Sequence, residues 1–125
     1  KPEFLFEVAQ CLSKTGRYEK ANGYLERAVL LSSDPMLYYV MAKNEQCLGE
    51  YRQAEKHLLH AIDILPERIY PYYLLMNLYT EPSYFQPAKL KMAIDSVLTK
   101  KPKVESSAIK EMKEKARSML NNTSI

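Results

Sequence analysis

Two histidines, His57 and His60, stand three residues apart, and they are the only histidines in this chain of 125 residues. On a helix this spacing places both imidazoles near one face, where they could share a metal ion. Neither cysteine, Cys11 nor Cys47, is placed by the sequence to add a ligand, and no Glu-x-x-His pair lies on a facing helix. We therefore expect two solvated histidines and no metal site. A metal-assisted enzyme built on this pair is kept as an alternative.

Other catalytic patterns are missing from the sequence. Three glycines cannot build a phosphate-binding loop, and neither G-x-x-x-x-G-K, G-x-G-x-x-G nor G-x-S-x-G occurs. Carboxylates such as Glu50 and Glu55 are expected on solvent-facing sides of helices. We therefore predict no catalytic residue and no cofactor, and we expect that this chain alone is not an enzyme.

The net charge of +3 is unevenly distributed along the chain. Residues 1–88 hold nine Lys and Arg against eleven Asp and Glu, whereas residues 89–125 hold nine against four. The basic end could bind a polyanion or an acidic membrane surface, or it could be the solvated face of the last helices. The candidate cations are Lys100, Lys101, Lys103, Lys110, Lys113 and Arg117. Nothing points to a specific nucleic acid as the partner.

No apolar run approaches the roughly 20 residues that a membrane-spanning helix needs, so no transmembrane segment is expected in this chain. Residue 1 is Lys rather than Met, which suggests an excised or processed piece of a longer protein.

The helices that would position these side chains are predicted by a sequence pattern that occurs twice. Residues 16–35 (GRYEKANGYLERAVLLSSDP) return as residues 49–66 (GEYRQAEKHLLHAIDILP) at an offset of 33. Such a period is typical of stacked repeat units. Small residues on one helix face would let two helices approach closely, and each glycine would adopt a left-handed turn. The matched pairs are Gly16 with Gly49, Tyr18 with Tyr51, Ala21 with Ala54, Leu25 with Leu58, and Ala28 with Ala61.

The flanking residues predict the helix boundaries. Asp34 can cap a helix whose first residue is Pro35, and Pro66 should end the helix before it. In the third stretch, Tyr72, Leu75, Met76 and Tyr79 share a face, but Glu81-Pro82-Ser83 replaces the glycine turn. The next helix could be capped at Ser83 or could begin at Pro87.

These Gly-x-Tyr turns and paired alanines resemble the tetratricopeptide repeat (TPR), which implies an all-α, right-handed α-α superhelix. The expected single domain, residues 1–125, holds helix-turn-helix units at about 2–34, 35–68 and 69–102, with a capping helix at about 106–120. The apolar stripe of that last helix is Ile109, Met112, Ala116, Met119 and Leu120, and residues 121–125 should fray. The sequence departs from the family at the usual tryptophan (Leu5, Tyr38) and at an aromatic position (Leu12, Glu45).

In this family the first helix of each unit lines a concave groove. The resemblance places Phe6, Gln10, Tyr39, Lys43, Tyr73 and Asn77 in that groove. It implies a non-catalytic module that binds an extended peptide or a partner helix of another protein. The alternative is that these aromatic residues pack against an extra helix or a neighbouring chain.

A narrower resemblance rests on ERIYPYYLLMNLY (residues 67–79) and PAKLKMAIDSVLTKKPKVES (residues 87–106). These segments look like the soluble C-terminal repeat region of O-antigen ligase-like and polymerase-like membrane proteins of Bacteroidetes. The implied role is a scaffold tail of a bacterial membrane glycan-assembly protein, on an unknown side of the membrane, with the glycan chemistry in the missing membrane part. A free-standing TPR adaptor is the alternative.

Overall fold

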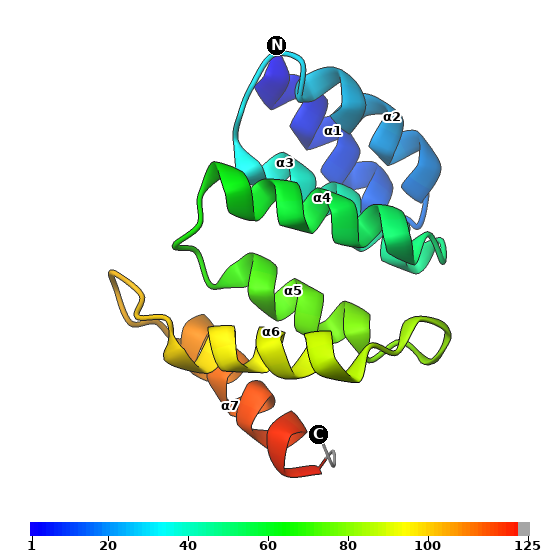
Figure 1. Ribbon diagram of the computed structural model, residues 1–125. Helices are drawn as coiled ribbons and strands as arrows, with labels where there is room; N and C mark the ends of the chain where they lie inside the picture. The colour runs from blue at the N-terminus through cyan, green and yellow to red at the C-terminus, as the bar shows by residue number, and fades with distance from the viewer. Residues whose placement is uncertain (123–125) are drawn as a thin grey trace. The chain divides into compact units, whose positions relative to one another are not determined.

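The computed structural model describes residues 1–122, and over this range the chain forms seven α-helices and one short 3-10 helix without any strand (Figure 1). The chain divides into two compact units, residues 1–66 and the part that begins at Glu67. Each unit is described by itself. The description of residues 1–125 as a single domain stays a prediction.

The first unit consists of two helical hairpins. The first pairs α1 (Pro2–Lys14) with α2 (Tyr18–Ala28), and the second pairs α3 (Pro35–Cys47) with α4 (Tyr51–Ile64), while α2 packs on α3. The paired alanines lie at these contacts: all four are buried, as the repeat pattern predicts. They are Ala21, Ala28, Ala54 and Ala61.

Glycine turns close both hairpins, as predicted. Gly16 has φ of +81° and Gly49 has φ of +78°, so both adopt the left-handed conformation. In the first turn the Arg17 N–H donates to the Leu12 carbonyl at 2.8 Å, and the Gly16 N–H donates to Ser13 at 3.1 Å. This pair of bonds is the Schellman motif, which satisfies carbonyls that the end of α1 would otherwise leave unpaired.

The predicted boundaries of α3 and α4 are also confirmed. Asp34 Oδ1 accepts a hydrogen bond from the Met36 N–H at 2.9 Å, and α3 begins at Pro35. The α4 helix ends at Ile64, two residues before Pro66.

A buried amide pair joins the two hairpins, and the sequence analysis did not foresee it. Asn22 Nδ2 on α2 donates to the Met41 carbonyl on α3 at 3.2 Å, and Asn44 Nδ2 donates to Asn22 Oδ1 at 2.8 Å. Both asparagines are buried, so these bonds fix the position of α2 on α3 with few polar groups left unsatisfied.

The second unit contains α5 (Tyr70–Tyr79), the 3-10 turn η1 (Pro82–Tyr84), α6 (Pro87–Thr99) and α7 (Ser107–Asn122). Of the two predicted starts for the sixth helix, the structure adopts Pro87, because Pro82 to Tyr84 form the separate 3-10 turn. On the predicted face of α5, Leu75, Met76 and Tyr79 are buried.

The stripe predicted for the last helix is confirmed, because Ala116 is buried and its four other members are half-buried. The helix continues through Asn122, so the expected fraying at residues 121 and 122 was wrong. The rest of that expectation, for residues 123–125, lies outside the described residues.

Candidate functional site

The predicted groove residues of the first unit differ in their accessibility. On α1, Phe6 is half-buried and packs against the hydrophobic core, whereas Gln10 is exposed. On α3, Tyr39 is only 3% exposed, whereas Lys43 is exposed. The Tyr39 ring is therefore a core side chain, and Gln10 and Lys43 are the members of this set that a partner could reach directly.

The predicted groove residues of the second unit lie on α5. Tyr73 is half-buried, its ring stacks on Tyr70 with centroids 6.4 Å apart, and Lys115 Nζ lies 5.5 Å from the ring centroid. Asn77 is also half-buried, and within residues 1–122 its buried Oδ1 has no hydrogen-bond partner. A binding role for these six residues remains a prediction.

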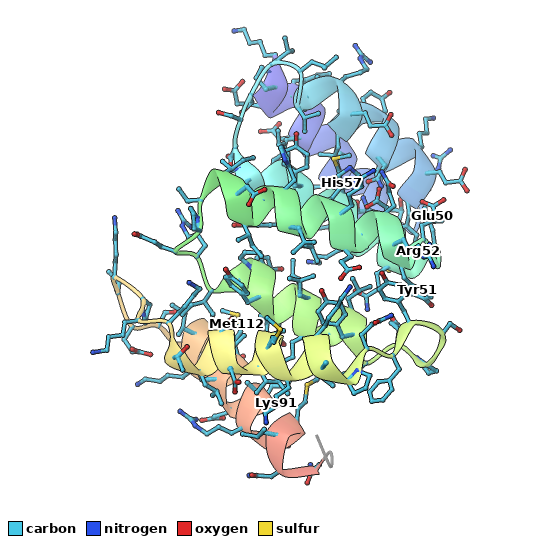
Figure 2. All side chains as sticks on the ribbon, viewed as in Figure 1. Glu50, Tyr51, Arg52, His57, Lys91 and Met112 are labelled. Carbon is cyan, nitrogen blue, oxygen red and sulfur yellow. The ribbon has the colours of Figure 1, made fainter. Side chains whose placement is uncertain are left out.

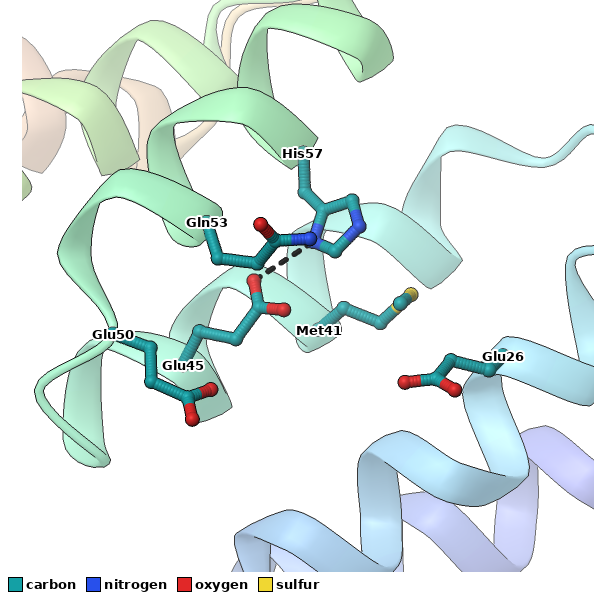
Figure 3. Close-up of a pocket in the computed structure, with 6 residues that line it drawn as sticks. All are labelled: Glu26, Met41, Glu45, Glu50, Gln53 and His57. Carbon is teal, nitrogen blue, oxygen red and sulfur yellow. Dashed lines mark hydrogen bonds and ion pairs between the residues drawn. The ribbon is translucent and has the colours of Figure 1, made fainter.

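An open cleft of about 480 Å³ in the first unit is lined mainly by polar side chains of α2, α3, α4 and the turn before α4 (Figure 3). Its lining residues are Glu26, Met41, Glu45, Glu50, Gln53 and His57. Figure 2 locates two of them on the whole unit, Glu50 at the turn before α4 and His57 further along that helix.

A hydrogen-bonded pair of a histidine and a glutamate lies in this cleft. His57 Nδ1 is 2.8 Å from Glu45 Oε1, and the two side chains are 18% and 6% exposed. The expectation of a solvated His57 was therefore wrong, because the imidazole pairs with a carboxylate from the neighbouring helix. The expectation of a solvent-facing Glu55 was wrong too, since Glu55 is 8% exposed.

The other histidine, His60, is exposed and lies one turn further along α4. The Tyr38 ring contacts both imidazoles, with its centroid 5.8 Å from that of His57 and 4.7 Å from that of His60. Among the described residues, no group of three or more His, Cys, Asp or Glu is arranged to hold a metal ion. Cys11 and Cys47 are both exposed and free.

The cations of the basic C-terminal third are not equally available. Lys113 Nζ donates to the carbonyls of Val97 at 2.8 Å, Leu98 at 3.2 Å and Lys100 at 2.9 Å. Lys100 Nζ lies 5.0 Å from the centroid of the Tyr72 ring. The four other candidate cations are exposed, namely Lys101, Lys103, Lys110 and Arg117.

Comparison with solved structures shows the fold. The chain is similar to the type III secretion translocator chaperone SycD of Yersinia enterocolitica, with a TM-score of 0.84 and 15% identity over 98% of this chain and 89% of that one. The structure of SycD in complex with a peptide of the translocator YopD has a TM-score of 0.83 and 16% identity, over 95% of this chain and 88% of that one. The Sgt2 TPR domain from Aspergillus fumigatus has a TM-score of 0.75 and 15% identity, over 99% of this chain and 83% of that one.

These structures confirm the predicted class of fold, an all-α TPR-like α-α repeat. No protein-family model matches the chain, and no curated protein matches it. The narrower resemblance to O-antigen ligase-like proteins finds no counterpart among these structures. No helix within residues 1–122 is long and apolar enough to cross a bilayer.

Proposed function

We propose that this chain is a non-catalytic protein-interaction module that holds a peptide segment of a partner protein along the first helices of its repeats. The observation that carries the proposal is the shared fold with SycD, which was solved with a translocator peptide bound. The exposed side chains of Gln10 on α1 and Lys43 on α3 support it, because both occupy predicted groove positions of the first unit.

The mechanism is recognition by a preformed surface. Both hairpins of the first unit are fixed by glycine turns, buried alanines and the Asn22–Asn44 bond. Little of this unit has to become ordered when a peptide binds, which lowers the entropic cost of association. Gln10 can donate to and accept from a peptide backbone, and Lys43 can pair with a carboxylate.

A peptide library displayed on phage tests the proposal with the whole chain as bait. Peptides selected on the wild-type chain should lose at least about tenfold in affinity for the Gln10→Ala, Lys43→Ala double variant, as expected for central polar contacts. The matched control is Lys20→Ala, Lys56→Ala, because these exposed lysines lie on the second helix of each hairpin. Equal loss in both variants, or in neither, would contradict the assignment.

Salt dependence separates this function from the alternative, a binder of polyanions or acidic membranes through the C-terminal third. Four exposed cations at a phosphate-rich surface should lose roughly 10²-fold in affinity between about 50 and 200 mM salt. A peptide held by Gln10 and Lys43 meets only one charge, that of Lys43. Its affinity should therefore change by less than about threefold over the same salt range.

The narrower form of the proposal makes the chain the tail of a bacterial membrane glycan-assembly protein. Its support is the sequence of residues 67–79 and 87–106. Fractionated native cells probed with an antibody to this domain provide the test. A membrane-bound band far larger than 14.5 kDa is expected, whereas a small band outside the membrane fraction would leave a free-standing adaptor.

A further inference from the structure

The last helix, α7, is the least buried α-helix of the second unit. Six residues of α5 and four of α6 are buried, whereas Ala116 is the one buried residue of α7 within the described range. Burial of apolar side chains supplies most of the free energy that docks a helix. We therefore expect α7 to be held less firmly than the two helices on which it packs.

Polar contacts add to the half-buried apolar stripe in placing α7. Lys113 Nζ donates to three carbonyls at the end of α6, and Lys115 Nζ lies over the Tyr73 ring on α5. We call this surface of α5 and α6 the α7 seat, marked by the Tyr73 ring and the carbonyls of Val97, Leu98 and Lys100. The seat therefore selects a helix by a cation at one point and by a small residue, Ala116, at another.

The α7 helix carries its own stabilising features. Ser106 Oγ accepts a hydrogen bond from the Ile109 N–H at 3.2 Å, which caps the first turn. Lys110 and Glu114 stand four residues apart on its surface, as do Glu111 and Lys115. Residues 100–106, which join it to α6, form no helix. It can therefore leave the seat without unwinding α5, and its departure exposes three carbonyls at the end of α6 to water.

We propose that the α7 seat is a binding site for an amphipathic helix of a partner protein, and that α7 fills this site until such a helix displaces it. The partner helix carries a small residue at the place of Ala116 and apolar residues seven and four positions before it. A lysine stands three positions before it, at the place of Lys113. The proposal does not depend on a peptide groove in the first unit.

The short tether makes α7 a strong competitor. A flexible connection of this length gives an effective concentration in the millimolar range, so a partner must bind the seat more tightly than α7 does. The seat is then closed to weak ligands and open to helices that match it well.

Fluorescence anisotropy tests the proposal with a labelled synthetic peptide of residues 105–122 as the probe. The full-length Ala116→Asp variant cannot bury its own α7, because residue 116 is 0% exposed and a buried unpaired carboxylate is costly. This variant should bind the peptide at least about tenfold more tightly than the wild-type chain, whose seat is filled. A peptide with Ala116→Asp is the matched control and should not bind.

The result that overturns the proposal is equally specific. If the Ala116→Asp chain unfolds cooperatively by circular dichroism and yet binds the peptide no better than the wild type, the seat does not accept a helix in trans. A wild-type dimer at micromolar concentration that Ala116→Asp abolishes would assign the seat to a second copy of this chain and overturn the partner-protein form.

Hydrogen exchange on the wild-type chain gives a test that needs no variant. Amides of residues 107–122 should exchange before those of α5 and α6, because α7 opens by itself. Exchange of all three helices with one common free energy would show that α7 does not leave the seat. The phage-selected peptides test the proposed groove at Gln10 and Lys43 independently of the α7 seat. Failure of one proposal therefore leaves the other standing.

Discussion

Replacing Lys113 with Met removes the ammonium group at the end of α6 and keeps a side chain of similar length. In the wild type, Lys113 Nζ donates to the carbonyls of Val97, Leu98 and Lys100 at 2.8 to 3.2 Å. The α6 helix has no basic residue in its last turn and no glycine turn after it, since Lys100 is extended with φ of −71° and ψ of 138°. Lys113 is therefore the main partner that the described chain provides for these carbonyls.

The size of the effect follows from these contacts. A hydrogen bond that involves a charged group contributes about 1.5–3 kcal/mol to stability. A cation near the C-terminus of a helix adds about 0.3–1 kcal/mol. The three bonds share one ammonium, and the site is only partly buried, so water replaces part of what is lost. We expect Lys113→Met to lower the free energy of unfolding of the second unit by about 1.5–3 kcal/mol.

Urea unfolding followed by circular dichroism measures this change, and hydrogen exchange locates it in α6 and α7. The matched control is Lys110→Met on the exposed face of α7, which should change the free energy of unfolding by less than about 0.5 kcal/mol. The two substitutions remove the same charge from the same helix. If the two variants unfold at the same urea concentration, the three bonds do not stabilise the unit and the reasoning fails.

Three further predictions concern the first unit. Gly49→Ala should destabilise the chain by about 1–2 kcal/mol, because φ at this position is +78°. Gly23→Ala inside α2 should stabilise the chain by about 0.5–1 kcal/mol, because the added Cβ meets nothing within 4 Å. Opposite shifts in melting temperature are the expected result, and shifts of the same sign would refute the turn argument. Asn22→Ala should cost about 1–3 kcal/mol in urea unfolding, since it leaves buried polar partners unpaired; a neutral change would mean that the amide pair is not stabilising. A double-mutant cycle of Glu45→Ala and His57→Ala should give a coupling energy of about 0.5–3 kcal/mol, because the two groups are 2.8 Å apart, and additive effects would show that the contact does not contribute.

Much of the fold of the first unit could be predicted because its determinants are local and occur twice. Glycine permits a left-handed turn, aspartate caps a helix with its own side chain, and the proline ring fixes φ, so each acts locally whatever the rest of the chain does. Gly16, Gly49 and Asp34 therefore do in the structure what their types require. The third turn has no such glycine, and the sequence left the start of its second helix open between Ser83 and Pro87.

The polar contacts could not be predicted because they depend on which helix lies opposite. Periodicity treats Glu55 and His57 as surface residues, although Glu55 is buried and His57 is half-buried in the structure. One signal was available: Asn22 and Glu55 stand 33 residues apart, each directly after a buried alanine of the repeat. Polar residues at equivalent positions beside buried alanines favour an internal hydrogen-bonding role. The replacement of an aromatic residue by Glu45 was a second such signal.

The contrast between the helix ends explains why the last helix matters to the second unit. In the first unit, the carbonyl ends of α1 and α3 are each completed by a glycine turn that the next three residues make. In the second unit, α6 ends in extended backbone, and three of its terminal carbonyls receive the side chain of Lys113, which follows 13 to 16 residues later. Docking of α7 and completion of α6 are therefore coupled. Any helix that replaces α7 must bring a cation to the same point, which is why the proposed partner carries a lysine at the place of Lys113.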